Sequence, residues 1–230
     1  MKLSNRLHTV STFITPQSIL ADIGTDHGYI PIFLVSNGTI PFAYAMDINE
    51  GPLERAKSHI DENGLADKIQ VRLSNGLDKL GENEADSILI AGMGGALTVD
   101  ILSRGWKVAK SAKELIISPH SEVFLVREYL QEKGYRIVRE EMIKDMDKYY
   151  VIMKWVKGLE EKYSECELLY GPLMLKNKDK ICFEFLNKEK DNFIKILKAM
   201  PDNGKSDTQK RKTELLEKIK VVECALKYFD

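Results

Sequence analysis

The chain reads ADIGTDHGYIP at residues 21–31, where a short apolar segment, residues 19–23, runs into a turn that holds two glycines. A continuous apolar segment of this length is typical of a strand buried on both faces of a parallel sheet. Outward from this turn, residues 20–157 alternate short apolar runs with amphipathic stretches, which indicates strands and helices in turn. The sequence therefore predicts an α/β fold with a ligand site at the carboxyl end of its first strand.

Seven strands are predicted, at residues 19–23, 42–48, 69–73, 87–91, 114–118, 135–143 and 149–156. Helical stretches separate the first five: Pro52 opens a helix over 53–62, and Ser121 is expected to cap one over 122–133. The last two strands are separated only by the polar residues 144–148, which predicts an antiparallel hairpin. Five strands with crossovers, then a helix and a hairpin, distinguish the Rossmann-like sheet of methyltransferases from that of dehydrogenases.

Strand signals end near residue 158. Residues 176–200 and 208–228 read as two helices joined by Pro201-Asp202-Asn203-Gly204. We therefore expect two domains, a ligand-binding domain over 1–157 and a coiled-coil-like helical hairpin over 158–230. Residues 176–220 hold 13 Lys or Arg and 8 Asp or Glu. This excess predicts either a solvated helix face or an arm that contacts phosphates.

Composition describes an ordinary globular chain of 230 residues, with 43% apolar residues, 30% charged residues and a net charge of -1. No stretch approaches the roughly 18 apolar residues of a spanning helix, and residues 1–6 lack the apolar core of a signal peptide, so we expect a cytoplasmic protein without membrane contact. Cys166, Cys182 and Cys224 are far apart in sequence and form no C-x-x-C pair, so we interpret them as small core residues. Four scattered histidines predict no metal site.

The glycine turn distinguishes between two kinds of nucleotide cofactor. A dinucleotide fingerprint needs a second glycine where this chain has Asp26, and a carboxylate there would repel a diphosphate. S-adenosylmethionine carries no phosphate, and its amino group and sulfonium are both positive. The sequence therefore favours S-adenosylmethionine over NAD or FAD. The candidate cofactor ligands in this turn are Asp22, Gly24, Asp26 and Gly28.

Turns after the next strands add further candidates. Asp47 ends the second strand, where a carboxylate can accept hydrogen bonds from ribose hydroxyls. Residues 74–77 can present an amide and a backbone N–H to an adenine, or form a plain turn. Residues 91–95 can let the backbone pass close to a transferred methyl group, or serve only as a small-residue helix start. The candidate ligands here are Asp47, Asn75, Gly76, Leu77, Ala91, Gly92 and Met93.

Three features accompany the ADIGTDHGYIP turn: IAGMGG at 90–95, LSNRL at 3–7 and the helical tail. With them, the chain resembles the bacterial tRNA (adenine-22-N1)-methyltransferases, the TrmK family, over nearly its whole length. The resemblance implies a Rossmann-like class I methyltransferase domain that binds S-adenosylmethionine, a C-terminal coiled coil, and methylation of adenine N1 at position 22 in the D-arm of tRNA. The expected partner is therefore tRNA.

Candidate residues for this reaction lie around the same edge of the sheet. Asp26 can stabilise the cationic product or serve only as a cofactor ligand. His27 and Tyr29 can hydrogen-bond or stack on the base, although His27 can equally make a hydrogen bond at the helix start. The remaining candidates are Pro119 and His120 beside the cleft, Arg6 for a carboxylate or a phosphate, and Lys210, Arg211 and Lys212 as a tRNA clamp.

Two other functions stay open at this point. The chain can be an S-adenosylmethionine-dependent methyltransferase for a protein or a small molecule, with the tail as a dimerisation or lid element. It can also be a non-catalytic RNA-binding module that keeps a nucleoside pocket. The sequence leaves the oligomeric state open and favours a monomer.

Overall fold

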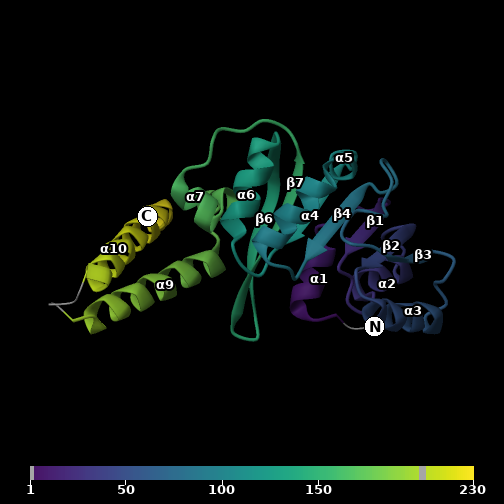
Figure 1. Cartoon of the computed structure of the whole chain (residues 1–230), viewed down its shortest axis with the longest axis horizontal. Coiled ribbons are helices and arrows are strands. Elements are labelled where there is room, and N and C mark those ends of the chain that lie inside the picture. Colours follow the sequence, from purple (N-terminus) through teal and green to yellow (C-terminus); the bar gives the residue numbers. More distant parts are fainter. Residues whose placement is uncertain (1–2, 202–205) are drawn as a thin grey trace. The chain divides into compact units, whose positions relative to one another are not determined.

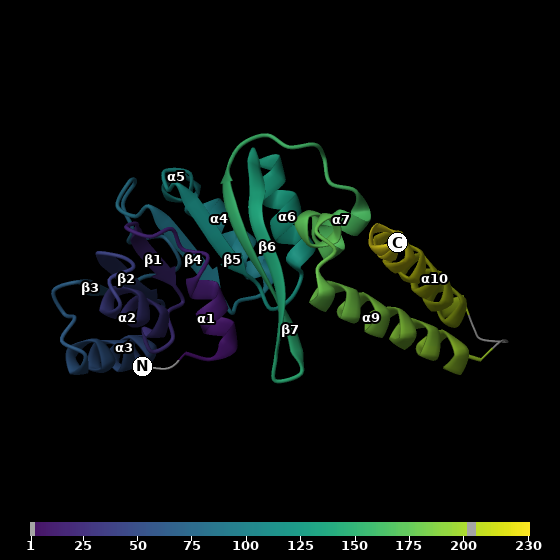
Figure 2. The same cartoon turned by 180° about the vertical axis from the view of Figure 1, so that it is seen from behind.

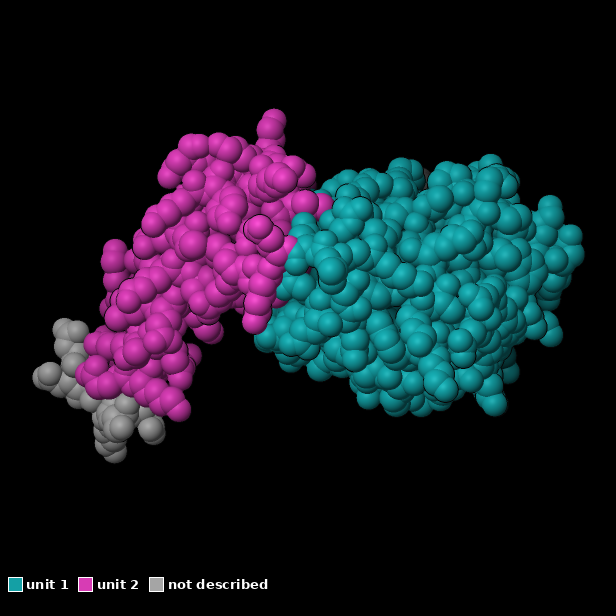
Figure 3. Space-filling model, turned by 90° about the horizontal axis from the view of Figure 1, so that it is seen from above, with its two compact units in different colours: residues 1–160 teal, residues 161–230 magenta. Residues whose placement is uncertain are grey.

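The computed structural model describes residues 3–201 and 206–230 of the chain. It contains two compact units, residues 1–160 and residues 161–230, which are coloured separately in Figure 3. Asp202, Asn203 and Gly204 of the predicted helix connection lie outside the described residues. Within the described residues, no helix combines the length and the apolar character that crossing a bilayer requires.

The first unit is built on a seven-stranded sheet with the order β3-β2-β1-β4-β5-β7-β6 (Figure 1). The strands are β1 (Ile19–Ile23), β2 (Phe42–Asp47), β3 (Ile69–Leu73), β4 (Ser87–Ala91), β5 (Glu114–Ser118), β6 (Tyr135–Asp145) and β7 (Lys148–Lys157). The pairs among β1 to β5 are parallel, whereas β7 runs antiparallel to both β5 and β6. This order confirms the Rossmann-like methyltransferase sheet that the sequence predicts.

Helices cover both faces of this sheet (Figures 1 and 2). They are α1 (Asn5–Ser11), α2 (Tyr29–Ser36), α3 (Glu50–Glu62), α4 (Gly95–Arg104), α5 (Trp106–Ala109) and α6 (Val123–Glu132). Val10 near the end of α1, Ile32 of α2 and Ile60 of α3 belong to one buried apolar cluster with residues of β1, β2 and β3. Consecutive residues of the central strands, such as Leu20 and Ala21, are buried, which explains why these strands are largely apolar on both faces.

Several predicted boundaries differ from the structure. Helix α3 begins at Glu50, before Pro52, because the chain already turns helical after Asn49. Ser121 does not cap α6: it forms a β-bridge with Gly94, and Glu122, with φ of +51°, precedes the helix instead. The predicted turn at 144–148 shrinks to two residues with positive φ, 146 and 147, so both hairpin strands are longer than predicted. Two positive-φ residues match the twist of a tight hairpin.

In the part of the second unit that the structure describes, all regular structure is helical. It contains α7 (Glu165–Tyr170), α8 (Pro172–Lys176), α9 (Lys180–Ala199), α10 (Ser206–Leu226) and the 3-10 turn η1 (Lys227–Phe229). Helices α7 and α8 are not among the predicted elements, and the first long helix begins at Lys180 instead of the predicted residue 176. The chain breaks there because Lys178 has φ of +52° and the Asp179 side chain caps α9. On α10, Leu215 and Val222 are buried, whereas Leu216 is exposed.

A buried ion pair links α6 to the hairpin. The Arg127 and Glu140 side chains are both fully buried, with Arg127 Nη2 2.9 Å from Glu140 Oε1. We expect Arg127→Met to destabilise the protein by about 3–5 kcal/mol, because it leaves a buried charge without compensation. The double variant Arg127→Met/Glu140→Leu should lie much closer to the wild type. Urea denaturation measures both free energies of unfolding, and equal losses in the two variants would contradict this expectation.

Candidate functional site

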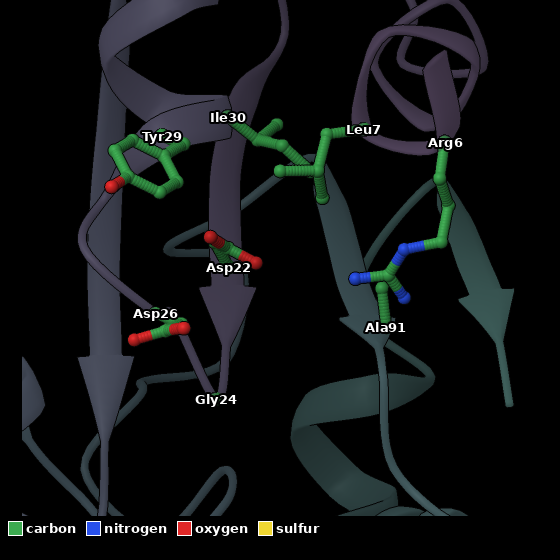
Figure 4. A pocket seen from close by; sticks show the side chains of 8 residues that line it. All are labelled: Arg6, Leu7, Asp22, Gly24, Asp26, Tyr29, Ile30 and Ala91. Carbon is green, nitrogen blue, oxygen red and sulfur yellow. The ribbon is translucent and has the colours of Figure 1, made fainter. Parts of the chain in front are cut away.

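The site lies where the order of the strands reverses. From β1 the chain moves outward to β2 and β3, and then returns to β4 on the other side of β1. Ile23 pairs with Ile90, so the turn after β1 and the turn after β4 start side by side. Ligands bind open α/β sheets at this switch point. A pocket opens here, lined by Arg6, Leu7, Asp22, Gly24, Asp26, Tyr29, Ile30 and Ala91 (Figure 4).

Asp22 supplies the buried carboxylate of this pocket. It lies one residue before the end of β1, is only 7% exposed, and its Oδ2 accepts a hydrogen bond of 2.7 Å from the Thr25 hydroxyl. Burial raises the pKa of Asp22 to about 6, the hydrogen bond from Thr25 opposes this rise, and the charge of Asp47 adds to it. A carboxylate with a raised pKa gains most from a positive ligand, because the ligand stabilises the ionised form.

Gly24 brings the backbone close to the turn after β4. Its φ is +75°, and its N–H donates to the Met46 carbonyl at 2.8 Å, which holds the turn against β2. A Cβ at this position would overlap the terminal methyl group of Met93. The structure thus brings Gly24 and Met93 together, as candidate ligands from two different turns. A side chain at Gly24 would displace Met93 as well as strain the backbone.

Aromatic rings stack behind the exposed Asp26. The Asp26 side chain is 73% exposed, and its Oδ1 lies 3.2 Å from His27 Nε2 and 3.8 Å from Arg55 Nη2. The His27 ring stacks on Tyr29 at 5.1 Å and on His59 at 5.4 Å between ring centroids. His59 Nδ1 also contacts the His27 carbonyl at 3.2 Å. The stack holds His27, whose φ is +60°, and so defines where the Asp26 carboxylate lies.

The ends of β2 and β3 lie farther along the same edge. Asp47 Oδ1 accepts a hydrogen bond of 2.8 Å from the Asn49 backbone N–H, and the Ser74 N–H donates to the Asp47 carbonyl. Asn75 Oδ1 accepts from Arg104 Nη2 at 3.3 Å. The Leu77 side chain is 2% exposed and packs against Gly105, so it belongs to the core. Only the backbone of Leu77 can face a ligand.

A second cluster lies beside the turn after β4. Arg6 Nη1 is 2.8 Å from His120 Nε2, and the Arg6 guanidinium lies over the Tyr150 ring at 5.2 Å. His120 and Tyr150 make an edge contact at 5.5 Å. A Cβ on Gly92 would lie 3.7 Å from both Arg6 Nη1 and the His120 ring, so these side chains cover Gly92. We call Arg6, His120 and Tyr150 the Arg6 cluster.

The protonation of His120 follows from its contact with Arg6. A guanidinium can only donate hydrogen bonds, so His120 Nε2 accepts and the imidazole is neutral, with its proton on Nδ1. Burial, and after it the positive charges of Arg6 and Lys148, lower the pKa of His120. The Arg6 cluster therefore carries one positive charge, that of the guanidinium, beside a neutral donor.

The structure separates the remaining candidates. Pro119 and His120 follow β5, and His120 belongs to the Arg6 cluster, whereas Gly28 precedes α2 in the left-handed conformation with φ of +68°. The small size of Gly95 is explained by packing, because a Cβ there would overlap the Glu122 carbonyl. Lys210, Arg211 and Lys212 lie on α10 in the second unit. The described residues contain no group of three or more His, Cys, Asp or Glu that could hold a metal.

Three residues of the site carry no signal in the sequence. Leu7 and Ile30 line the pocket but look like ordinary core residues of their helices. Tyr150 lies on β7, more than a hundred residues from Arg6, and reaches the site only through the hairpin. The register of β7 on β5 is the only indication that could have pointed to it, since Ile117 pairs with Met153 and places Tyr150 beyond the end of β5.

Comparison with known proteins agrees with this geometry. Residues 3–153 match the family model of a methyltransferase domain. The chain is 32% identical over 222 residues to the tRNA (adenine(22)-N(1))-methyltransferase of Bacillus subtilis, covering 94% of this chain and 92% of that protein.

Two solved structures are similar throughout. Sp1610 of Streptococcus pneumoniae, in complex with S-adenosyl-L-methionine, is 32% identical with a TM-score of 0.88 and covers 98% of this chain and 100% of that one. M. capricolum TrmK, in complex with S-adenosyl-homocysteine, is 29% identical with a TM-score of 0.88 and covers 100% of both. From its fold, its pocket and these likenesses, the chain belongs to the TrmK family of tRNA (adenine-22-N1)-methyltransferases.

Proposed function

We propose that this protein transfers a methyl group from S-adenosylmethionine to N1 of the adenine at position 22 of tRNA. The observation that carries the proposal is the pocket at the ends of β1 and β4, which joins two carboxylates to apolar walls in a chain that belongs to this family. A diphosphate would meet the repulsion of Asp22 and Asp26 there. The positive sulfonium and amino group of S-adenosylmethionine are instead attracted by these two carboxylates.

The residues present fit S-adenosylmethionine. We assign the positive groups of the cofactor to Asp22, its ribose hydroxyls to Asp47, and its carboxylate to Arg6, which is the one cation among the residues that line the described pocket. The adenine lies at the turn after β3, where Asn75, Gly76 and the Leu77 backbone are available. Gly24, Gly28, Ala91, Gly92 and Met93 shape the walls. The chemistry that this cofactor supplies when bound is an activated methyl group.

The protein's own part in the reaction is orientation and charge. Adenine N1 has a free lone pair at neutral pH, so no base is needed to create the nucleophile. Aligned reactants gain roughly 7–11 kcal/mol over reactants that meet by diffusion. After transfer the base is cationic, and we assign its stabilisation to the Asp26 carboxylate, which His27 and Arg55 hold in place. Tyr29 and His27 offer ring faces on which a base can stack.

The Arg6 cluster supports a role in holding the acceptor nucleotide. Its ring and guanidinium cover Gly92 next to the pocket, and Pro119 precedes His120 there. We expect Tyr150→Ala to raise the KM for tRNA by about tenfold, as the loss of one stacking surface implies, with a smaller loss of affinity for S-adenosylmethionine, because the ring also lies against Arg6. Tyr150→Phe keeps the ring and should behave as wild type. Steady-state kinetics with tRNA as the varied substrate make the test, and a KM unchanged in Tyr150→Ala would exclude the role.

N1 lies on the Watson–Crick edge of adenine, so the base must be unpaired or extruded before it can react. Binding elsewhere on the tRNA then has to position it. We propose that α10 contributes through Lys210 and Arg211, which are exposed, and through Lys212 beside them.

Reversing these three charges, Lys210→Glu/Arg211→Glu/Lys212→Glu, should weaken tRNA binding and lower its dependence on salt, because fewer counterions are released. The matched control Lys210→Arg/Arg211→Lys/Lys212→Arg keeps the charge and should bind as wild type does. Filter binding between about 50 and 200 mM salt measures the slope. If the reversed variant keeps the wild-type slope, the solvated-face interpretation of α10 is correct instead.

A nucleoside map tests the proposed function directly. The protein is incubated with isotopically labelled S-adenosylmethionine and unmodified tRNA that carries adenine or guanine at position 22. We expect labelled 1-methyladenosine only from the first tRNA. Methylation of a protein or a small molecule instead would favour the second function, and cofactor binding without turnover on any tRNA would favour the third. Because tRNA is the substrate, we propose that the protein acts in the cytoplasm. We also propose that it acts as a monomer.

A further inference from the structure

Two cysteines that are far apart in the sequence meet in the second unit. Cys166 lies on α7 and Cys224 on α10, 58 residues later, yet their Sγ atoms are 3.3 Å apart. The sequence interpretation of small core residues is therefore confirmed for Cys166, which is buried, and wrong for Cys224, which is exposed. A disulfide requires an S–S distance of about 2.0 Å, so the two sulfur atoms need to approach by little more than 1 Å.

The two thiols differ in access to solvent. Cys224 is exposed, whereas Cys166 is 3% exposed and has the Ser164 hydroxyl 3.5 Å from its sulfur. Burial raises the pKa of the Cys166 thiol, and the neighbouring Cys224 raises it further. An oxidant from solvent reaches Cys224 first, because Cys224 is exposed. The thiolate is the form that reacts, and the raised pKa of Cys166 disfavours its thiolate. Cys166 then lies within contact distance as the resolving thiol.

The third cysteine provides a comparison within the same chain. Cys182 lies on α9, is fully buried, and donates to the Tyr170 carbonyl at 3.8 Å. It shares the helical unit and the burial of Cys166, but its sulfur faces a backbone carbonyl. An oxidant that reacts with all cysteines, whatever their distance from another thiol, would modify Cys182 together with Cys166 and Cys224.

We propose that Cys166 and Cys224 are an oxidation site that closes to a reversible disulfide between α7 and α10 when the protein meets a peroxide. The Cys224 thiolate attacks one peroxide oxygen, the O–O bond breaks, and a sulfenic acid and water form once a proton is taken up. The Cys166 sulfur then attacks the sulfenic sulfur, the S–S bond forms as the S–O bond breaks, and a second water leaves. A dithiol reductant restores both thiols.

The disulfide has a physical consequence for the second unit. It closes a loop between positions 58 residues apart, which removes conformational freedom from the unfolded chain more than from the folded one. The oxidised protein should therefore melt several degrees above the reduced protein. The disulfide between α7 and α10 does not involve the methyl-transfer reaction, and so the proposal does not rest on the proposed function.

The test uses the full-length protein, treated with a small excess of hydrogen peroxide and then denatured for thiol titration and peptide mapping. We expect the free thiols of the wild type to fall from three to one, with a Cys166–Cys224 peptide by mass spectrometry. In the Cys182→Ser variant, peroxide should oxidise both remaining thiols to the same Cys166–Cys224 disulfide. Cys166→Ser and Cys224→Ser should form no intramolecular disulfide.

Several results would overturn the proposal. They are a wild-type protein that keeps all three thiols, a disulfide that includes Cys182, and crosslinks only between chains on a non-reducing gel. Serine is close to cysteine in size, so each variant should fold, and circular dichroism checks this. If the melting temperature of the disulfide-linked wild type does not rise, the claim that the disulfide stabilises the protein is wrong.

Discussion

Replacing Asp26 with Asn is expected to lower the kcat of tRNA methylation about a hundredfold while changing the affinity for S-adenosylmethionine less than about threefold. The substitution keeps the size of the side chain and removes its charge. Asp26 lines the pocket, and its carboxylate lies between His27 and Arg55 at the turn where the cationic product forms under the proposed mechanism. Loss of the charge thus acts on the step in which the base becomes positive.

The exposure of Asp26 makes this variant informative. Its side chain is 73% exposed, so the substitution should change the free energy of unfolding by no more than about 0.5 kcal/mol. A drop in turnover then reports on chemistry and not on folding. Glu54→Gln removes an exposed carboxylate from α3 and serves as the matched control, which should keep full activity.

Kinetics at saturating S-adenosylmethionine separate the two roles that the sequence leaves open for Asp26. A catalytic carboxylate lowers kcat, whereas a cofactor ligand raises the KM for S-adenosylmethionine and leaves kcat unchanged. Isothermal titration calorimetry gives the cofactor affinity independently. An Asp26→Asn variant with wild-type kcat and a weakened affinity would assign Asp26 to the cofactor and remove it from the chemistry.

Asp22→Asn is expected to stabilise the ligand-free protein at pH 8 and to weaken its binding of S-adenosylmethionine. The pKa of Asp22 is raised from 3.8 to about 6 in the folded protein, chiefly by burial. A difference of about two pKa units corresponds to up to about 3 kcal/mol between the two protonation states. Asparagine has no ionised form, and its amide oxygen can still accept the hydrogen bond from Thr25.

The direction of the Asp22 pKa shift determines the pH range over which the stability of the protein changes. The folded-state pKa lies above the unfolded-state value, so the folded protein binds the proton of Asp22 more tightly. The resulting stability is fully present below about pH 4 and is lost as the pH rises through 6. The two proteins should therefore unfold alike at pH 4, diverge between pH 4 and 6, and differ by a constant amount above. Urea denaturation across this range measures the divergence.

Cofactor binding should show the opposite trend. A positive ligand stabilises the ionised Asp22, so the wild-type affinity for S-adenosylmethionine should fall by up to about tenfold for each pH unit below 6. The Asp22→Asn variant should bind weakly and with a flat pH profile in this range. Asp67→Asn, an exposed carboxylate before β3, is the control. Identical pH profiles for the wild type and Asp22→Asn would refute the assignment of Asp22 to the positive groups of the cofactor.

Local pattern was sufficient for the central sheet. The bounds of β1, β3, β4 and β5 agree with the predicted segments. Strands β1, β4 and β5 are buried, nearly continuous apolar runs that polar turns interrupt sharply, whereas the edge strand β3 alternates apolar and polar residues. Boundaries were less accurate where a single backbone conformation decides them, as at Glu122 and Lys178, whose positive φ values no residue preference signals. Helices α7 and α8 are short, so their periodicity was too brief to detect.

The same distinction holds for the site. Asp22, Gly24, Asp26, Tyr29, Ala91 and Arg6 were all candidates from sequence, and the structure brings them into one pocket. They could be found because parallel strands deliver their carboxyl ends to one edge. The sequence did not show that the Leu77 side chain lies in the core, since an apolar residue in a turn carries no sign of which side chains will surround it. As a cofactor ligand through its backbone, Leu77 stays a prediction. The roles of these residues stay predictions until the variants are measured.

The order of residues along the chain settled the fold, the family and the chemistry that the first turn can hold, because these depend on neighbours in sequence and on strands that end in glycine and aspartate. Folding added what depends on distance in space. It carried Tyr150 to Arg6 and His120, placed Asp47 near enough to Asp22 to shift its titration, and set Cys224 against Cys166. Long-range packing fixes such pairs, and residue spacing along the chain contains no information about them.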